Sequence, residues 1–369
     1  MPEYDVIVVG AGSAGLNTAI NCAKAGLSVA ALEEHNKIGF PRHCSGLYST
    51  RFLSLMEVKE DFYEHEVFGA KFHPPSGKII ELMRKEKVAF VINRELLDDF
   101  LGKRAKECGV NIISNSKVSD FTADPNGATI TTDKKTLTTK FICGADGSNS
   151  FIARSLGFKP PHRLHGIMAI TKDEGHSNYV DLYFDNKLYP GFFAWRIPRG
   201  KTTEYGIAGE TGPANVNNFN NFLAKFDVKK YELSSGVIPF GFQKSYSDRV
   251  LLVGDAAAQV KPLTGGGVIY GMICARIAAR VFSDAISKNR FDEKFMAKYQ
   301  KLWRSAIGKG IARGLLIRKI YSRMSNRSID AWFSLLNNRV TKNIFENHGD
   351  MEFILERRPH ATVLNQPSL

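Results

Sequence analysis

Apolar residues at the start of the chain follow first the spacing of a strand, then that of a helix, then that of a strand again. Tyr4–Val9 is mostly apolar and predicts a buried strand. Ala14–Ala25 has apolar residues at helical spacing, and Leu27–Glu33 predicts a second buried strand. The three segments together predict a βαβ unit of about 30 residues.

Further along, strand-like segments outnumber helices until the last quarter of the chain. Val67–Phe72 and Ile79–Met83 flank a turn rich in Pro and Gly and predict a hairpin. Arg94–Cys108 predicts a helix that ends at Gly109. Other strands are expected at Asn111–Ser114, Lys117–Phe121, Ala128–Thr132, Phe141–Ala145, Tyr179–Phe184, Phe192–Ile197 and Arg249–Gly254, and a long helix from about Gly267.

The length of the chain, 369 residues, exceeds what one hydrophobic core usually organises. We therefore expect an α/β fold with two interleaved domains and a helical extension. Segments 1–66, 88–160 and 244–290 are expected to form a dinucleotide-binding domain. Segments 67–87 and 161–243 are expected to form an antiparallel β-sheet domain that takes the substrate, and 291–369 a basic helical region.

Charge and composition narrow the classes of partner. The formal net charge of +13 favours anionic partners such as nucleic acid, a phosphorylated substrate or an acidic membrane, unless the source proteome is basic as a whole. No run reaches about 18 apolar residues, since charges interrupt even Val268–Ile286, so a transmembrane helix is not expected. The N-terminus lacks signal-peptide features and the five cysteines form no C-x-x-C pair, so we expect a cytoplasmic protein.

The first predicted strand is followed at residues 10–15 by GAGSAG, the G-x-G-x-x-G pattern of dinucleotide-binding turns. Gly10 permits the tight turn, Gly12 lets the backbone approach a pyrophosphate, and Gly15 allows close packing of the helix on the strand. The first N–H groups of the helix, at Ser13 and Ala14, favour an anion. The pattern predicts a dinucleotide with its diphosphate at this helix N-terminus.

An acidic residue ends the second predicted strand. Glu33 is placed to accept hydrogen bonds from a ribose hydroxyl, and its neighbour Glu34 is a further candidate contact. Because an acid here would repel a 2′-phosphate, the resident dinucleotide is expected to be FAD or NAD rather than NADP.

Two later glycine-rich turns favour FAD over NAD. Each follows an apolar strand, and the second combines an acid at the strand end with a glycine-rich helix start, which suits a polyol phosphate and a flat ring system. A dehydrogenase that uses NAD alone has no use for this second anion site. The candidate contacts at these turns are Asp146, Gly147, Gly254, Asp255, Pro262, Gly265, Gly266 and Gly267.

The fingerprint, Arg94 and the turns at Asp146–Gly147 and Gly254–Asp255 together resemble the flavoproteins related to p-hydroxybenzoate hydroxylase. The resemblance implies a single-Rossmann FAD fold in which Arg94, Val118 and Asp255 contact FAD and Asp146–Gly147 supports the cofactor fold. No second G-x-G-x-x-G is present. Electrons are therefore expected from NADPH or NADH that docks transiently, or from a carrier such as ferredoxin.

Three segments are more specifically similar to the geranylgeranyl reductase family. They are Pro41–Gly46, Gly191–Pro198 with Gly206, and Gly254–Gly271. The resemblance implies hydride delivery from reduced flavin to an isolated alkene of a polyprenyl lipid or prenyl diphosphate, with a proton added at the neighbouring carbon. The chain departs from the family pattern where Phe193 replaces a tyrosine, Ile197 a phenylalanine and Ala208 a glycine.

The loop at 43–46 is expected to reach the flavin, with Ser45 and Gly46 among the cofactor contacts. Cys44 either relays a proton and shapes the site or simply packs against the isoalloxazine, because thiol reactivity cannot be read from sequence. His43 is a candidate general acid or a structural residue. Candidate substrate contacts, with core packing as the alternative, are Phe193, Trp195, Pro198 and Tyr270. No metal site is expected.

The C-terminal region is predicted to contain a basic amphipathic helix. Its apolar face runs from Trp303 to Met324 at steps of three and four residues, widened by Leu316 and Ile320. This face either packs on the protein over the substrate cleft or also rests on anionic lipid. Nucleic-acid binding is not expected, because exposed aromatic residues are not grouped with the basic ones.

Two rival functions share the cofactor fold. One is an oxygen-dependent flavin monooxygenase or halogenase, whose W-x-I-P element overlaps Trp195–Pro198 although the full halogenase motif is absent. The other is a prenyl-group carrier without flavin, similar to the Rab GDP-dissociation inhibitors. The intact Gly254–Asp255 turn and the triple glycine argue against the carrier.

Overall fold

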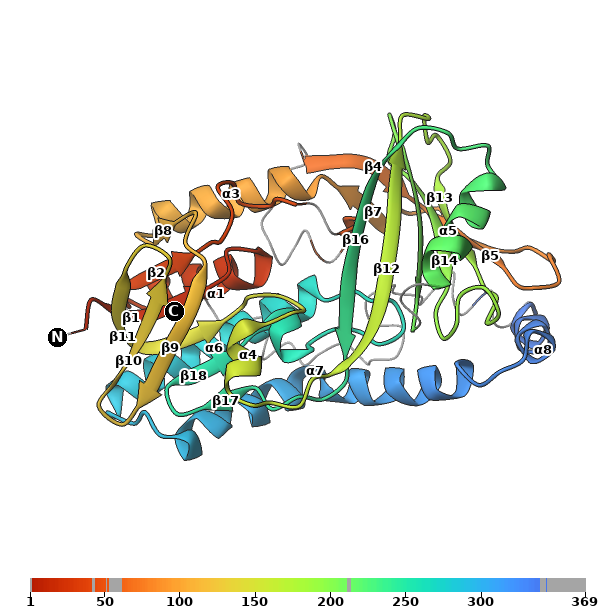
Figure 1. Cartoon of the computed structure of the whole chain (residues 1–369). Coiled ribbons are helices and arrows are strands. Elements are labelled where there is room, and N and C mark those ends of the chain that lie inside the picture. Colours follow the sequence, from red (N-terminus) through yellow and green to blue (C-terminus); the bar gives the residue numbers. More distant parts are fainter. Residues whose placement is uncertain are drawn as a thin grey trace.

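The structure is a computed structural model that describes residues 2–41, 44–50, 52, 62–210, 214–338 and 343. Two large sheets occupy opposite ends of the molecule, and a long C-terminal helix passes beside both (Figure 1). His43, a predicted site residue, lies outside the described residues.

The first large sheet has a parallel centre. Its strands are β1 (Tyr4–Val9), β2 (Val29–Leu32), β8 (Asn111–Ile113), β9 (Val118–Asp124), β10 (Gly127–Thr132), β11 (Thr136–Gly144), β17 (Tyr246–Ser247) and β18 (Val250–Leu252). Their order is β17-β18-β11-β1-β2-β8, with β9 and β10 as an antiparallel meander on β11. β1 is parallel to both neighbours, and its last four residues are apolar and buried, as expected of a parallel strand covered on both faces.

Helices α1 (Ser13–Lys24), α3 (Arg94–Glu107) and α6 (Val268–Ser287) belong to the core on one side of this sheet. Small residues let α1 and α6 cross closely. A Cβ at Gly254 would lie 2.7 Å from the Cβ of Ala14, and one at Gly271 would lie 3.3 Å from it. This contact brings the Gly254 turn beside the glycine turn of α1, although about 240 residues separate them in the chain.

The second large sheet has the order β16-β12-β15-β14-β13-β5-β6. Its strands are β5 (Gly69–His73), β6 (Ile80–Met83), β12 (His162–Thr171), β13 (Tyr179–Tyr183), β14 (Ala194–Pro198), β15 (Thr203–Gly209) and β16 (Tyr231–Phe240). All its pairings are antiparallel except that of β13 with β5. The predicted hairpin of β5 and β6 is confirmed, and α5 (Ala214–Ala224) packs against β12 and β15.

A small sheet between the two large ones has the order β3-β7-β4 and was not predicted. Its strands are β3 (Leu47–Ser49), β4 (Tyr63–Val67) and β7 (Ala89–Ile92). Each is short, and the pairing joins segments distant in sequence, so local hydrophobic periodicity gives little signal. The small sheet holds the loop before β3, which carries Cys44, against the entry to α3.

The C-terminal region forms α7 (Glu293–Tyr321) and α8 (Asn326–Leu336). The packed side of α7 includes Trp303, Ile307 and Gly314, as predicted, but Leu316 and Ile320 are 61% and 57% exposed. These two residues of the predicted apolar face therefore do not pack on the protein. Gly314 packs closely on the ring of Pro262, since a Cβ at this glycine would lie 3.0 Å from the ring. This contact fixes which side of α7 faces the protein. Within the described ranges, no helix is both long and apolar enough to cross a bilayer.

Candidate functional site

The turn between β1 and α1 fits tightly against the strand beside it. Gly10 has φ +96°, and a Cβ there would lie 2.4 Å from the carbonyl oxygen of Ala145. A Cβ at Gly15 would lie 1.9 Å from the carbonyl oxygen of Gly10. A Cβ at Gly12, in contrast, would meet no atom within 4 Å. Gly10 and Gly15 are thus needed by the polypeptide itself, whereas Gly12 faces open space.

Two helices begin at glycines without a side-chain cap. α3, α7 and α8 have their first N–H groups capped by Asn93, Asp292 and Ser325, whereas α1 and α6 begin at Gly12 and Gly267 with no side-chain cap and no acid in the first turn. Uncapped N–H groups combined with the helix dipole form an anion site. The start of α1 therefore fits the diphosphate of a dinucleotide, and the start of α6 offers a second set of free N–H groups to another part of the same ligand.

Glu33 lies at the end of β2 beside the glycine turn. One carboxylate oxygen accepts a hydrogen bond from the Ala11 amide at 2.9 Å, and the other meets the amide and ring of His35 at 3.0 and 2.8 Å. The carboxylate is mostly buried, while Glu34 next to it is exposed. Glu33 is thus fixed in orientation at the turn where the sequence places a ribose.

Asp146 is used within its own turn. Its two carboxylate oxygens accept from Ser150 Oγ at 2.6 Å and from the Ile152 amide at 3.1 Å, at the start of α4 (Phe151–Ser155). Gly147 has φ +76°, which favours glycine. The turn supports the backbone around Ala145, which contacts Gly10. Asp146 therefore stabilises the backbone beside the glycine turn and does not itself point to a ligand-binding role. Val118 packs in the second core cluster of this sheet, which also contains Val9 and Leu32.

Asp255 follows β18, within the short 3₁₀ helix Gly254–Ala257 that precedes the start of α6. Burial raises the pKa of its carboxyl to about 6, and the charge of Arg94 opposes this shift. A Cβ at Gly267 would lie 2.8 Å from an Asp255 oxygen, so only glycine leaves room for the carboxylate. Among the described residues, no side chain donates a hydrogen bond to this carboxylate. A polyol hydroxyl would supply the missing donor.

The backbone under Asp255 is held by a buried polar chain. The Gly254 amide donates to Gln259 at 2.8 Å, the Gln259 amide donates to the Tyr299 hydroxyl at 2.9 Å, and that hydroxyl donates to the Leu252 carbonyl at 2.9 Å. The following loop carries the other predicted contacts. A Cβ at Gly265 would closely approach Ile238, and a Cβ at Gly266 would closely approach Lys261. Pro262 packs against Gly314 of α7.

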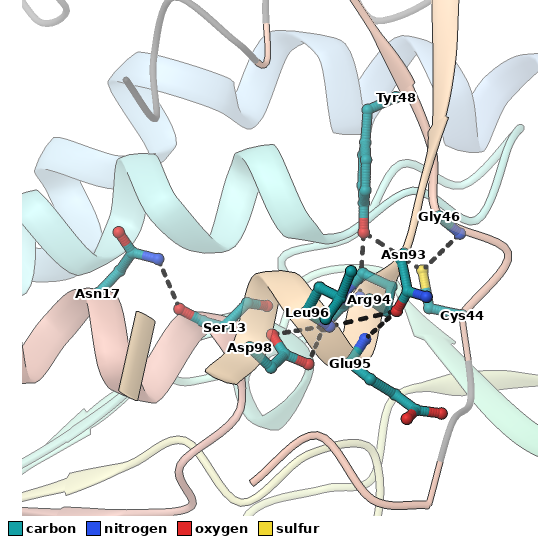
Figure 2. A network of polar contacts seen from close by, with 10 residues as sticks. All are labelled: Ser13, Asn17, Cys44, Gly46, Tyr48, Asn93, Arg94, Glu95, Leu96 and Asp98. Carbon is teal, nitrogen blue, oxygen red and sulfur yellow. Dashed lines mark hydrogen bonds and ion pairs between the residues drawn. The ribbon is translucent and has the colours of Figure 1, made fainter. Parts of the chain in front are cut away.

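Arg94, at the start of α3, connects the two ends of the candidate site. It binds both carboxylate oxygens of Asp98, at 3.2 and 2.9 Å, and donates to the Tyr48 hydroxyl at 3.0 Å (Figure 2). Burial raises the pKa of Asp98, and the Arg94 charge opposes that shift. Because the charge of Arg94 also acts on Asp255, the Arg94 guanidinium lies near the turn expected to hold the riboflavin part.

Cys44 lies in the loop before β3. Its sulfur is 3.4 Å from the Tyr48 hydroxyl oxygen and 3.5 Å from the Gly46 amide nitrogen (Figure 2). Gly46 has φ +69°, and a Cβ there would lie 2.2 Å from the Ile92 carbonyl oxygen. The Ser45 carbonyl accepts a hydrogen bond from Arg199. The loop that holds Cys44 is therefore fixed on two sides.

The predicted aromatic wall lies on β14 and the loop before it. Phe193 stacks on Phe192, with 4.1 Å between ring centroids, and meets Trp195 edge-on at 6.3 Å. The Trp195 indole donates to the buried Glu204 at 2.9 Å. A Cβ at Gly206 would lie 2.2 Å from the Trp195 ring, so this glycine makes space for the indole.

The other two predicted substrate contacts, Pro198 and Tyr270, are buried. Pro198 ends β14, where its Cα would be 2.8 Å from a Cβ at Gly175. Tyr270 lies in α6 within the core of the first sheet.

Sequence reasoning missed Tyr48, Arg199 and Glu204. Arg199 is buried and pairs with Glu64 and Glu204, at 3.1 Å for the latter, while it donates to the Ser45 carbonyl. These residues come from three separate segments, so only the tertiary fold shows that they meet. Arg199 and Glu204 flank the polar segment Gly200–Thr203, so no local pattern marks either residue as buried.

Comparison with known proteins gives the family. Residues 3–188 match the model described as FAD binding domain. The chain is 30% identical to digeranylgeranylglycerophospholipid reductase 2 of Methanothermobacter thermautotrophicus, over 93% of this chain and 94% of that protein. It is also 30% identical to digeranylgeranylglycerophospholipid reductase 1 of Methanococcoides burtonii, over 89% and 86%.

Solved structures show the same fold. A geranylgeranyl bacteriochlorophyll reductase-like protein of Thermoplasma acidophilum aligns with a TM-score of 0.84 at 24% identity, over 97% of each chain. The halogenase PltM in complex with phloroglucinol and FAD aligns with a TM-score of 0.70 at 16% identity, over 99% of this chain and 89% of that one. The predicted single-Rossmann fold with an antiparallel sheet is confirmed, and the chain belongs to the FAD-binding-domain family of flavoproteins that includes the digeranylgeranylglycerophospholipid reductases.

Proposed function

We propose that this protein is an FAD-dependent reductase that saturates double bonds of geranylgeranyl chains carried by a lipid or a prenyl diphosphate. The observation that carries the proposal is that relatives bearing the name digeranylgeranylglycerophospholipid reductase match over about nine tenths of the chain. The site supports it, because two uncapped helix starts fit a dinucleotide and an apolar aromatic wall lies on β14 and the loop before it.

The cofactor would be held by residues from four elements. Gly12 and the first turn of α1 would bind the diphosphate, Glu33 a ribose and Asp255 the ribityl chain, with the start of α6 close to the ring system. Reduced FAD supplies a hydride to the alkene. The seven-stranded sheet is proposed to form the substrate domain, with Phe193 and Trp195 lining the path of the apolar chain.

An isolated alkene develops no oxyanion, so the protein has to contribute a dry pocket, orientation and a proton. Cys44 is proposed as the proton donor, because it is the thiol in the fixed loop next to Tyr48 and Arg94. The other four cysteines are not placed in this way, and Cys22, Cys143 and Cys274 are fully buried in the core.

The test is anaerobic incubation of the reduced protein with a geranylgeranyl lipid. We expect products heavier by pairs of hydrogen atoms, together with reoxidised flavin. No gain in mass across several prenyl lipids and diphosphates would refute the proposal. A product that forms only with oxygen would indicate a monooxygenase or halogenase, and a purified protein without flavin would indicate a carrier.

The electron donor is proposed to be a transient partner, either NADPH or NADH or reduced ferredoxin, because the sequence has one dinucleotide fingerprint. Stopped-flow bleaching of the oxidised flavin by each donor in turn tests this. A donor that reduces the flavin faster than the enzyme turns over is the functional one, and failure of all three would contradict the proposal.

We also propose that α7 and α8 contact an anionic membrane surface. Between Lys294 and Ile329 the sequence has ten Lys and Arg and no Asp or Glu. Four large apolar side chains on these helices are exposed, namely Leu316, Ile320, Trp332 and Leu335. Basic residues interspersed with exposed apolar ones are typical of helices that lie in the headgroup region. In Figure 1, α7 runs along the lower side of the molecule and α8 follows it at the right-hand end.

Sedimentation with vesicles tests this contact. We expect binding to vesicles containing phosphatidylglycerol, little binding to pure phosphatidylcholine, and release by high salt. The double change Leu316→Ser and Ile320→Ser should weaken binding. Leu233→Ser, at an equally exposed residue on β16, should leave it unchanged. Equal binding by both variants would contradict the assignment of this face.

A further inference from the structure

The Tyr48 hydroxyl lies between a fixed cation and the Cys44 thiol. Arg94 donates to the hydroxyl oxygen over 3.0 Å, and the Cys44 sulfur is 3.4 Å from the same oxygen. Asp98 holds Arg94 in place at 2.9 Å from the other side. Figure 2 shows the resulting chain from Asp98 through Arg94 and Tyr48 to Cys44.

The number of available donors fixes the direction of these hydrogen bonds. A guanidinium has no acceptor, so the Tyr48 oxygen accepts from Arg94. Tyr48 is buried, and in the part of the chain that the structure describes the Cys44 sulfur is the acceptor within reach of its hydroxyl. Because buried hydroxyls are nearly always hydrogen-bonded, the Tyr48 proton points at the sulfur.

A second donor approaches the same sulfur. The Gly46 amide nitrogen lies 3.5 Å from it, within the tight turn that follows Cys44. A sulfur that accepts from Tyr48 and from Gly46 directs its own S–H proton elsewhere. The two donors also remain in place when that proton has left.

We propose that Tyr48 and the Gly46 amide are positioning groups that aim the Cys44 proton at the substrate and then stabilise the thiolate. The inference rests on the proposed function. The alkene gains a hydride from reduced FAD at one carbon and the Cys44 proton at its neighbour. The S–H bond breaks, its electron pair stays on sulfur, and the alkene π pair forms the new C–H bond.

The hydroxyl of Tyr48 is not needed for packing. The ring stacks on Phe52 with 4.3 Å between centroids and belongs to the apolar core, so a phenylalanine would fill the same space. Among the residues that the structure describes, the charged groups that face this thiol are Arg94 and, behind it, Asp98. Arg94 polarises the hydroxyl and thereby strengthens its donation to a developing negative charge.

The test is the rate at which iodoacetamide alkylates Cys44 in the flavin-loaded enzyme, followed by peptide mass spectrometry across pH. Since the thiolate is the reacting species and a hydrogen bond to a charged group is lost, Tyr48→Phe should slow alkylation about tenfold at neutral pH. Its rate profile should also move to higher pH. Tyr4→Phe, whose hydroxyl contacts Asn111 at the far edge of the first sheet, should alkylate like the wild type.

Infrared spectroscopy of the wild type gives a second readout that does not depend on how the variant folds. The S–H stretching band of Cys44, identified by its loss in Cys44→Ala, should be that of a thiol not donating to a phenol oxygen. A band shifted to the low frequency of a donating thiol would overturn the proposal. So would wild-type alkylation of Tyr48→Phe together with intact prenyl reduction. If alkylation changes as expected but no prenyl lipid is reduced, the network stands and the proposed reaction fails.

Discussion

Replacing Gly12 by alanine should weaken FAD binding and leave the fold intact. Gly12 has φ −74° and ψ 179°, which alanine adopts freely, and its added Cβ meets no protein atom within 4 Å. The gain from a less flexible unfolded chain and the small loss from a poorer N-cap nearly cancel, so stability should change by less than about 1 kcal/mol. The methyl group would occupy the space through which the diphosphate approaches the amides of α1.

The loss in affinity follows from the hydrogen bonds that become too long. Each bond to a charged oxygen contributes roughly 1.5–3 kcal/mol, so losing one or two should weaken FAD binding by a factor between about ten and about ten thousand. Flavin fluorescence quenching on titration of the apoprotein measures this, and urea unfolding of the same apoprotein measures stability. Gly15→Ala is the control, because its Cβ would lie 1.9 Å from a backbone oxygen and should cost about 3 kcal/mol of stability. Equal destabilisation by both changes, or wild-type FAD affinity in Gly12→Ala, would refute the reasoning.

Two further predictions concern Asp255 and Gly206. The folded pKa of Asp255, about 6, lies above its usual 3.8, so the carboxyl favours folding at low pH and this contribution is lost as pH rises through 6. Asp255→Asn should therefore stabilise the apoprotein at pH 8 by on the order of 2 kcal/mol and have no such effect near pH 4, which urea titrations would show. The same change should weaken FAD binding, which a flavin titration would show. Gly206→Ala should displace Trp195 from Glu204, cost about 3 kcal/mol and shift tryptophan emission, whereas Gly166→Ala on the neighbouring strand, with 3.8 Å to its nearest atom, should do neither.

Features of the fold that depend on neighbouring residues in sequence were predictable. β1 was predicted with its observed bounds, and α1 and α3 begin and end within one residue of the prediction, because glycines and a strong cap mark their ends. The second turn at Gly254–Asp255 was also predictable, since it follows an apolar strand directly. The adjacency of this turn to α1 follows from the family resemblance and from the small residues that allow close packing.

Features that depend on distant segments were not predictable from one sequence. The small sheet pairs Leu47, Val91 and His65 across long stretches of chain, with strands too short to show periodicity. The direction of α7 depends on the contact of Gly314 with Pro262, which periodicity alone cannot show. Leu316, on the same predicted apolar face, is therefore left exposed.

The candidate cofactor site lowers the stability of the folded protein as long as no cofactor is bound. The starts of α1 and α6 have no side-chain cap, although a cap contributes about 1 kcal/mol and four other α-helices of the described residues have one. Asp255 has a raised pKa because burial disfavours its charge. An anionic diphosphate would accept hydrogen bonds from free helix N–H groups, and a hydroxyl of the cofactor would donate to the Asp255 carboxylate. Binding of the cofactor would therefore offset both unfavourable features. A site with these properties is expected to gain much of its stability from its ligand, and the unfolding midpoint should accordingly rise with the concentration of free FAD.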